Sequence, residues 1–422
     1  MTLIKASCFS FLMLFITCAF AKETSTETPI KHIVVIFQEN RPFDHYFGTY
    51  PHALNPKNEP RFIARKDTPR INGLTRALRE NNQNLHQPFR LSRSQVNTCN
   101  PNHKYTVLQQ SCDSGMMDQF VQTGGSVCSN PSVVMGYFDG NTVTALWNYA
   151  QFFSMSDNFH TTTIGASTVG AINLISGQPH GAIPNTLTEG STPIVVQGTI
   201  INDIDPKYDR CSATPDTVEL TGKNIGNRLN EKNITWGWFQ GGFRNCSQTH
   251  KGPSGQPVLD YVPHHNPFQF YKSTSNPLHL RPSSVSKIGK TDRANHLYDI
   301  SDFWAAVKDG NIPSVSFLKA AAYQNGHAGN SSPLLEQQFL TTTINRLQKT
   351  PQWKNMAIII AYDDSGGWYD HEVPPIINQS QIFADAFTAP GLCGTNPPFG
   401  GYQGRPGYGF RGPPSRFRPP KD

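Results

Sequence analysis

Two short apolar runs, each ending in oxygen-bearing side chains, constrain the fold of this 422-residue chain more than any other feature. Residues 33–37 (IVVIF) run into Gln38, Glu39 and Asn40, and residues 356–362 (MAIIIAY) run into Asp363 and Asp364. Unbroken apolar runs of this length indicate strands buried on both faces, as in parallel sheets. Ligands bind beyond the carboxyl ends of the strands in such sheets, so we expect the two acidic clusters to meet there.

The segment before the second run completes a strand–helix–strand pattern. Leucine, phenylalanine and isoleucine recur at helical spacing over residues 334–347. Further apolar segments at residues 193–196, 236–239 and 313–318 alternate with long polar stretches such as residues 52–115. We therefore predict an α/β fold, a sheet flanked by helices with long loop-rich insertions. The chain shows neither an internal repeat nor a heptad pattern, which argues against a solenoid or a coiled coil.

The first 21 residues are predicted to be a signal peptide. Lys5 precedes an apolar run at residues 8–20 (CFSFLMLFITCAF), and Ala19-Phe20-Ala21 has the small-x-small pattern of a cleavage site. The run falls short of the ~20 residues that span a bilayer, which disfavours a retained anchor helix. A lipoprotein attached through Cys18 is a further alternative. We expect the mature protein to be secreted or periplasmic.

Cleavage after Ala21 would leave an even number of cysteines. In an exported protein this favours disulfides over metal thiolates, and no two of them have Cys-x-x-Cys spacing. The connectivity stays open, because six cysteines allow 15 pairings. The six are Cys99, Cys112, Cys128, Cys211, Cys246 and Cys393.

Charge and hydropathy exclude two broad classes of protein. The chain has 36 Lys and Arg against 30 Asp and Glu, and no block of basic residues is dense enough to indicate nucleic-acid binding. A mean hydropathy of −0.45 excludes a multi-span membrane protein. Residues 390–422 form a basic tail rich in Pro and Gly. We expect this tail to be loosely attached.

The side chains that follow the two strands have the chemistry of a metal site. Glu39, Asn40, Asp363 and Asp364 offer four oxygen donors, which suit a divalent cation. Each pair by itself could instead be a helix cap or a solvated turn. Two histidine-bearing segments, HHNPF at residues 264–268 and NGHAGN at residues 325–330, add polar groups typical of a site.

Long segments of the chain resemble the bacterial phospholipase C and acid phosphatase family of phosphoesterases, whose fold is similar to that of alkaline phosphatase. The opening IKHIVVIFQENRPFDHYFGTYP at residues 30–51 is typical of that family. The resemblance continues in the family's order through residues 116–121, 148–160, 163–177, 264–271, 312–320 and 351–375. It implies that residues 22–389 are a phosphoesterase domain with an alkaline-phosphatase-like sheet.

The resemblance also implies roles for individual residues. Glu39, Asn40, Asp363 and Asp364 match the family's metal ligands, and Ser167 occupies the place of its nucleophile. The family's GPSxPNRxxxxSG motif reads GASTVGAINLISG here, so Val169-Gly170-Ala171 replaces Pro-Asn-Arg. Thr162, Thr163 and Thr168 are therefore alternatives to Ser167. The residues that resemble the family's active-site histidines are His103, His264, His265 and His327, the last followed by Ala328 rather than proline.

The predicted function is that of a secreted, metal-dependent phospholipase C. It would cleave glycerophospholipids into diacylglycerol and a phosphorylated head group through a phosphoseryl intermediate, with zinc the first choice of metal and calcium, magnesium or manganese as alternatives. Its partners would be a phospholipid or small phosphoester and, transiently, a membrane surface, but no nucleic acid; the sequence predicts no particular oligomeric state. Four aromatic residues could contact lipid or belong to the core: Phe152, Phe153, Trp368 and Tyr369.

Two alternatives to this function stay open on the sequence. The first is a broad acid phosphatase acting on monoesters, since the same site would serve both reactions. The second is a secreted binding protein without turnover. In the resembling family the GYGFR segment leads into a further strand and helix, whereas here residues 407–411 are followed only by GPPSRFRPPKD. We therefore expect a truncated C-terminus, and the loss of a core strand would cost a domain much of its ~5–15 kcal/mol of stability.

Overall fold

The computed structural model describes residues 26–186, 194–196, 198–212, 215–375, 408–413 and 415–417. The predicted signal peptide, residues 1–21, lies outside these ranges. None of the helices in the described part of the chain combines the length and apolar character that a membrane span needs.

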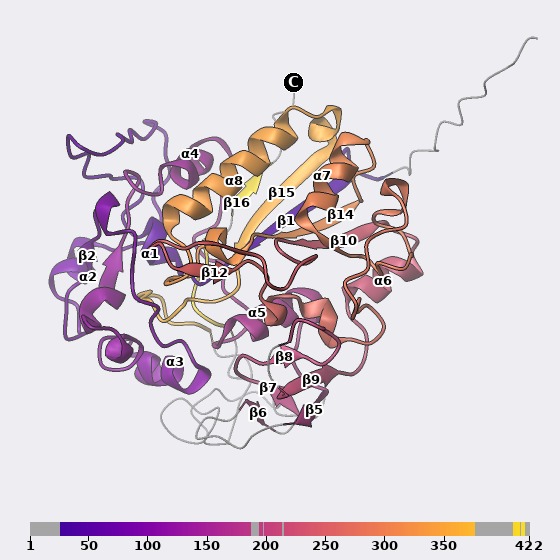
Figure 1. The fold of residues 1–422 in the computed structure, drawn as a ribbon. Helices are drawn as coiled ribbons and strands as arrows, with labels where there is room; N and C mark the ends of the chain where they lie inside the picture. Colours follow the sequence, from indigo (N-terminus) through magenta and orange to yellow (C-terminus); the bar gives the residue numbers. More distant parts are fainter. Residues whose placement is uncertain are drawn as a thin grey trace, which may run out of the picture.

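A central sheet of seven strands organises the described residues (Figure 1). Five neighbouring strands run parallel, and the last two strands at one edge join antiparallel. In spatial order the strands are β13 (Leu297–Asp299), β10 (Trp236–Gln240), β14 (Val315–Lys319), β1 (His32–Gln38), β15 (Met356–Tyr362), β16 (Ser415–Phe417) and β4 (Ser154–Met155). The two predicted strands, β1 and β15, are therefore central neighbours, and the predicted α/β sheet is confirmed.

Helices and smaller strands surround this sheet. The helices are α1 (Phe43–Phe47), α2 (Arg76–Glu80), α3 (Tyr105–Cys112), α4 (Thr144–Phe152), α5 (Ser167–Ser176), α6 (Ile225–Glu231), α7 (Ile300–Lys308) and α8 (Pro333–Gln348). The smaller strands are β2 (Phe89–Arg90), β3 (Gly136–Tyr137), β5 (Ala182–Thr186), β6 (Val195–Val196), β7 (Thr199–Ile200), β8 (Asp205–Pro206), β9 (Thr217–Leu220), β11 (Thr249–Lys251) and β12 (Pro257–Leu259).

Alternate side chains of β1 enter two separate cores, because successive residues of a strand point to opposite faces. Val34 and Ile36 pack with residues of α7 and α8 on one face. Val35 and Phe37 pack with residues of α5 and α6 on the other. The sheet is thus buried on both faces, which explains why β1 and β15 read as unbroken apolar runs.

Helix α8 shows how local sequence fixes an element of this fold. The Ser332 side chain accepts a hydrogen bond from the Leu335 amide, and Pro333 occupies the first turn, where its missing N–H costs nothing. The buried residues Leu340, Ile344 and Leu347 form one face of the helix against the sheet. The helix predicted over residues 334–347 is confirmed.

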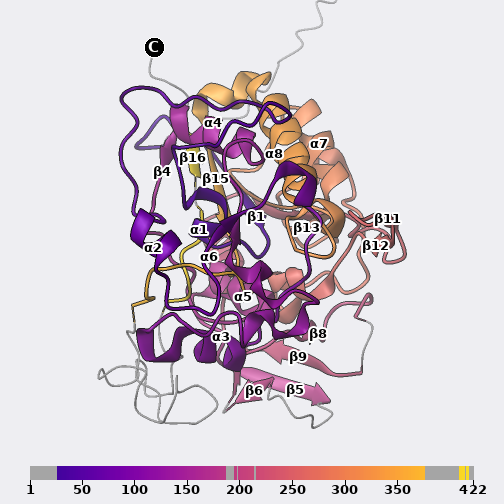
Figure 2. The same ribbon diagram turned by 90° about the vertical axis from the view of Figure 1, so that its left-hand side faces the viewer.

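The polar stretch at residues 52–115 lies on one side of the sheet, together with α1 and α4 (Figures 1 and 2). It contains α2 and α3 as well as loops.

A disulfide joins Cys99 to Cys128, and a second joins Cys211 to Cys246. The prediction of disulfides is confirmed for these two pairs. Cys112 has a buried free thiol, and Cys393 lies outside the described residues.

The expectation of a loosely attached tail is wrong for residues 408–413 and 415–417. Arg411 is buried and donates hydrogen bonds to Asp370 Oδ1 at 2.9 Å and Asp44 Oδ1 at 3.2 Å. Strand β16 pairs antiparallel with β15, so this segment supplies a strand of the central sheet. The composition was misleading because ion pairs, strand pairing and the buried Phe410 ring are enough to attach the segment.

A buried carboxyl group ties α8 to the sheet. Glu336 accepts hydrogen bonds from the hydroxyls of Tyr46, at 2.7 Å, and Tyr362. Burial raises the pKa of Glu336 to about 7, although both hydroxyls act to lower it. A carboxyl whose pKa is raised on folding contributes stability below its unfolded pKa and loses that contribution as the pH rises through its folded pKa.

We therefore predict that Glu336→Gln changes the pH dependence of stability. The free energy of unfolding should match that of wild type near pH 4 and exceed it by about 3 kcal/mol at pH 8, since each pKa unit corresponds to about 1.36 kcal/mol. Urea denaturation across this pH range measures the difference. Glu80→Gln on the exposed face of α2 should follow the wild-type profile. A constant offset between the Glu336→Gln and wild-type curves would contradict the prediction.

Candidate active site

The two acidic clusters meet where β1 and β15 end. Gln38 pairs with Tyr362 in the parallel register, so the residues that follow each strand come together. The backbone amide of Asn40 donates to Asp363 Oδ1 at 2.9 Å, across 323 residues of sequence. Asn40 has a φ of 53°, and the loop after β15 packs against it at Gly366, where a Cβ would lie 2.7 Å from Asn40 Cβ. Only glycine fits this approach.

Ser167 begins α5 with its hydroxyl at the centre of this cluster. Its Oγ lies 3.0 Å from Glu39 Oε2, 3.1 Å from Asn40 Oδ1 and 3.1 Å from Asp364 Oδ2. The side chain is buried. A hydroxyl has one proton, so it can donate to only one of three acceptor oxygens at a time. The arrangement therefore presents more hydrogen-bond acceptors to Ser167 than its single proton can satisfy.

The three threonines that the sequence leaves as alternatives to Ser167 lie in other environments. Thr162 is exposed, and the Thr163 hydroxyl donates to the carbonyl oxygen of Ile164 at 3.2 Å. The Thr168 hydroxyl donates to Asp203 Oδ1 at 2.8 Å. Ser167 is thus the one of the four whose hydroxyl contacts the acidic cluster.

Glu39, Asn40 and Asp364 each have one polar atom held by another residue and one oxygen that faces Ser167. Asp363 Oδ1 accepts from two backbone amides, whereas its Oδ2 is buried without a hydrogen-bond partner. Asp364 Oδ1 accepts from the Gly366 amide, and its Oδ2 faces Ser167. Buried polar atoms are rarely left unpaired. The orphaned oxygen of Asp363 and the acidic residues beside it are donors of the kind that a divalent cation prefers.

Burial makes the charges of this cluster costly. Desolvation, reinforced by the nearby charge of Asp363, raises the pKa of both Glu39 and Asp364 well above the ordinary range of carboxylic acids. Ionised carboxylates crowded in a buried site need a compensating positive charge. A bound dication would supply it, so the donor set and its electrostatics agree.

Two further groups contact Glu39 on the side away from Ser167. The Lys319 ammonium group at the end of β14 is fully buried and hydrogen-bonds to Glu39 Oε1. The same oxygen lies 3.2 Å from His265 Nδ1. Burial, followed by the positive charge of Lys319, lowers the pKa of His265 well below its usual value. His265 is therefore a neutral ring at neutral pH.

His103 and His327 lie beside the cluster with partly exposed rings. His103 Nε2 is 3.1 Å from Asn40 Nδ2, which donates to it, while His103 Nδ1 donates to the Pro101 carbonyl at 2.8 Å. The two rings are 5.7 Å apart between centroids. Burial, together with the charge of His103, lowers the pKa of His327 to about 4.

His264 is held by two aspartates, Asp203 and Asp205. Its Nδ1 lies 3.2 Å from Asp205 Oδ1 at the start of β8. Burial alone would lower the pKa of His264, but the carboxylates of Asp203 and Asp205 outweigh burial and raise it. Asp203 also accepts from the Thr168 amide, in the first turn of α5, at 3.0 Å. This histidine retains a proton more readily than His265 or His327.

The structure thus brings all nine predicted site residues together, and it adds three that the sequence analysis missed. Lys319 comes at the end of an apolar strand, much as Glu39 and Asp363 do. This position is the sequence feature that could have identified it. Asp203 and Asp205 lie in the segment INDIDP at residues 201–206, whose spacing resembles an ordinary polar turn. Nothing local in the sequence marks them as partners of His264.

Two other residue groups with metal-ligating side chains have different explanations. Cys211 and Cys246 lie near His279, but the two cysteines form a disulfide. Asp44, Asp370 and His371 also converge, and buried Arg411 forms ion pairs with both carboxylates. The guanidinium already supplies positive charge there, and the group attaches the C-terminal segment to the sheet.

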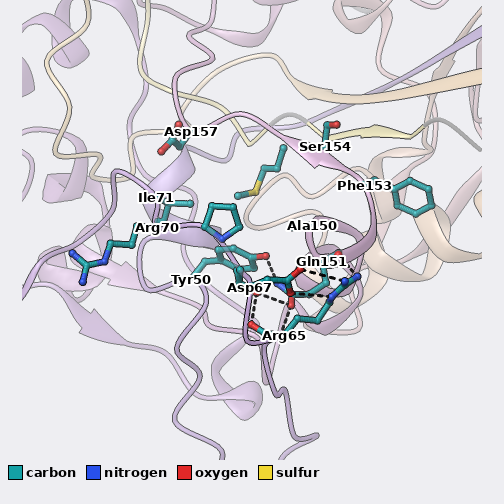
Figure 3. A pocket seen from close by; sticks show the side chains of 13 residues that line it. Tyr50, Arg65, Asp67, Arg70, Ile71, Ala150, Gln151, Phe153, Ser154 and Asp157 are labelled. Atoms are coloured by element: carbon teal, nitrogen blue, oxygen red, sulfur yellow. Dashed lines mark hydrogen bonds and ion pairs between the residues drawn. The ribbon is translucent and has the colours of Figure 1, made fainter. Parts of the chain in front are cut away.

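A separate surface cavity of about 560 Å³ lies beside α4 and β4 (Figure 3). Tyr50, Arg65 and Gln151 line it, and none of the nine predicted site residues does. Of the four aromatic residues considered for lipid contact, Trp368 and Tyr369 are buried in the core, Phe153 lines this cavity and Phe152 is exposed. The cavity and the polar cluster at the strand ends are therefore separate features of the structure.

A buried hydroxyl beside acidic side chains and four histidines, at the carboxyl edge of a parallel sheet, offers groups of the kinds that hydrolases use. The comparisons with known proteins agree with this class. The model of the Phosphoesterase family matches residues 30–413, and the chain belongs to that family. It is a phosphoric ester hydrolase, as the sequence predicted.

Three relatives illustrate the range of the family. Phospholipase C A of Mycobacterium tuberculosis (strain ATCC 25618 / H37Rv) is 25% identical over 398 residues, covering 92% of this chain and 67% of its own length. Non-hemolytic phospholipase C of Pseudomonas aeruginosa is 23% identical, covering 82% and 43%. Non-specific phospholipase C3 of Arabidopsis thaliana is 23% identical, covering 84% and 58%. This chain therefore spans between about two fifths and two thirds of these relatives' lengths.

Gly170, one of the three residues that differ from the family motif, lies close to the end of β15. A Cβ on Gly170 would lie 2.4 Å from the carbonyl oxygen of Asp363, so glycine lets α5 approach the end of β15. Replacing glycine by alanine inside a helix normally stabilises it by about 1 kcal/mol. Here the added methyl group would push Ser167 and Asp363 apart.

We predict that Gly170→Ala destabilises the protein by about 1–3 kcal/mol, the usual cost of overpacking, despite the better helix propensity of alanine. Chemical denaturation measures the free energy of unfolding. Asn345→Ala, on the exposed face of α8, is the propensity control and should be neutral or slightly stabilising. A stabilised Gly170→Ala protein would show that α5 does not pack against Asp363 as described.

Proposed function

We propose that this protein is a metal-dependent phospholipase C that uses Ser167 as its nucleophile. The observation that carries the proposal is the convergence of Glu39, Asn40 and Asp364 oxygens on the Ser167 hydroxyl at 3.0–3.1 Å. The names of the relatives favour phospholipids over other phosphoesters. We propose zinc as the metal, held by Glu39, Asn40, Asp363 and Asp364.

A dication bound by these residues would lower the pKa of the Ser167 hydroxyl and neutralise charge on the phosphoryl oxygens. The protein's own groups hold the reactants. Ser167 is fixed by its position at the start of α5, and His103 is fixed by Asn40 and the Pro101 carbonyl. Neutral rings at His265 and His327 add no positive charge that would repel a cation.

The proposed reaction has two displacements at phosphorus. The Ser167 hydroxyl gives its proton to solvent, and Oγ forms a bond to phosphorus while the bond to the diacylglycerol oxygen breaks. We assign His264 as the proton donor to that oxygen, because Asp203 and Asp205 raise its pKa against the effect of burial. Water then attacks the phosphoserine and releases the phosphorylated head group. Activity should fall as the pH rises through the pKa of His264, since the donor is then lost.

The side of the site that a substrate reaches follows from burial. Glu39, Asp363, Asp364 and Lys319 are buried, whereas His103, His264 and His327 are partly exposed. A phosphoester would thus approach past the histidines, which can donate to its oxygens, with the acidic oxygens behind the reacting phosphorus. We further propose that residues 22–389, together with the attached C-terminal segment, form the catalytic domain and that the protein is exported.

The test is a two-substrate assay on the purified full chain loaded with zinc. We expect release of phosphocholine and diacylglycerol from phosphatidylcholine vesicles, and loss of activity after chelation. If the protein cleaved only p-nitrophenyl phosphate, the phospholipase hypothesis would be wrong and the protein would be a phosphatase for monoesters. A folded protein that binds zinc but cleaves neither substrate would instead support a binding protein without turnover.

A second experiment tests the nucleophile. Ser167→Ala should lower kcat by at least about a hundredfold, because the attacking oxygen is removed while the rest of the site remains. The matched control, Thr162→Ala, alters an exposed hydroxyl in the preceding loop and should retain wild-type turnover. Equal melting temperatures would confirm that both variants fold. Near wild-type turnover in Ser167→Ala would eliminate Ser167 as the nucleophile.

A further inference from the structure

Lys319 is a buried cation inside a site otherwise built from acidic oxygens. Its side chain is fully buried, its ammonium group hydrogen-bonds to Glu39 Oε1, and it lies 3.9 Å from Asp363 Oδ2. The Phe37 ring lies 5.0 Å from the ammonium on another side, so the aromatic face adds to its stabilisation. Burying a lysine this completely is costly, and the fold retains it next to two proposed metal ligands.

The contacts of Glu39 show what Lys319 does to that ligand. Glu39 Oε1 faces Lys319 and His265, while Oε2 faces Ser167 at 3.0 Å. A carboxylate with one oxygen held in this way can rotate little, so its other oxygen stays aimed at the centre. Groups that hold a ligand's second atom are known to orient metal ligands and to tune them.

The formal charges show a second consequence. Glu39, Asp363 and Asp364 contribute three negative charges when ionised, and a dication contributes two positive ones. Without Lys319 the loaded site would carry a net negative charge and repel an anionic phosphoester. With Lys319 the sum is zero. A lysine can therefore balance charge where a second cation would otherwise be needed.

We infer that Lys319 neutralises the third carboxylate, so that a site with one dication accepts a phosphate anion. This inference rests on the proposed metal site but not on the choice of phospholipid as substrate. A fixed positive charge repels the dication and attracts the phosphate. Removing it should therefore tighten zinc binding and weaken phosphate binding, which a merely structural residue would not do.

The test compares Lys319→Met with the wild-type full chain at constant pH. Zinc affinity is measured by competition with a fluorescent chelator, and inorganic phosphate affinity by calorimetry on the zinc-loaded protein. We expect the Kd for zinc to fall about tenfold and the Kd for phosphate to rise about tenfold, as expected for one charge removed at close range in a partly screened site. Lys319→Arg keeps the charge and should return the phosphate Kd to within about threefold of wild type.

Two controls keep the result interpretable. Lys308→Met removes an exposed lysine at the end of α7 and should change neither Kd. Lys319→Gln removes the charge but retains a donor for Glu39 Oε1, so it provides the same test if Lys319→Met does not fold. Weakening of both ligands, or no change in either, would overturn the role assigned to Lys319. Wild-type protein that binds no zinc would overturn the metal site itself and this inference with it.

Discussion

The parallel pairing of β1 with β15 is the contact on which the rest of the site depends. Its register sets the residues after the two strands side by side, and the Asn40 amide then donates to Asp363 across the gap. The strands can be neighbours because both are apolar on both faces, with separate cores above and below. Hydrophobic burial thus provides the free energy that gathers mutually repelling carboxylates at one edge.

That gathering of charge accounts for the polar groups around it. Three buried carboxylates meet a lysine on one side and neutral or aspartate-held histidines on the others. One oxygen of Asp363 has no hydrogen-bond partner, and one serine hydroxyl faces three acceptors. Unpaired polar groups such as these would destabilise a core that had only a structural role. They are consistent with a site completed by a cation and an anionic substrate.

The C-terminal segment provides a second example of buried charges that compensate one another. Buried Arg411 lies between Asp44 and Asp370, which come from α1 and from the loop after β15. The segment that contains it then adds β16 to the edge of β15. Arg411 therefore holds together the start of α1, the loop that carries Asp363 and Asp364, and the last strand of the sheet. The stretch from Asp363 to Asp370 is thus attached to β15 at one end and to Arg411 at the other.

The sequence by itself determined the two central strands, helix α8, the meeting of Glu39 and Asn40 with Asp363 and Asp364, and the nearby histidines. Those features rest on local patterns, namely unbroken apolar runs, helical spacing and polar residues at strand ends. Only the tertiary structure decided that Lys319 joins the acidic cluster, that Asp203 and Asp205 hold His264, and that residues 409–413 are buried. Each of these depends on contacts between distant segments, which packing creates and no local pattern encodes. The close approach of Gly170 to the Asp363 backbone is likewise visible only in the tertiary structure.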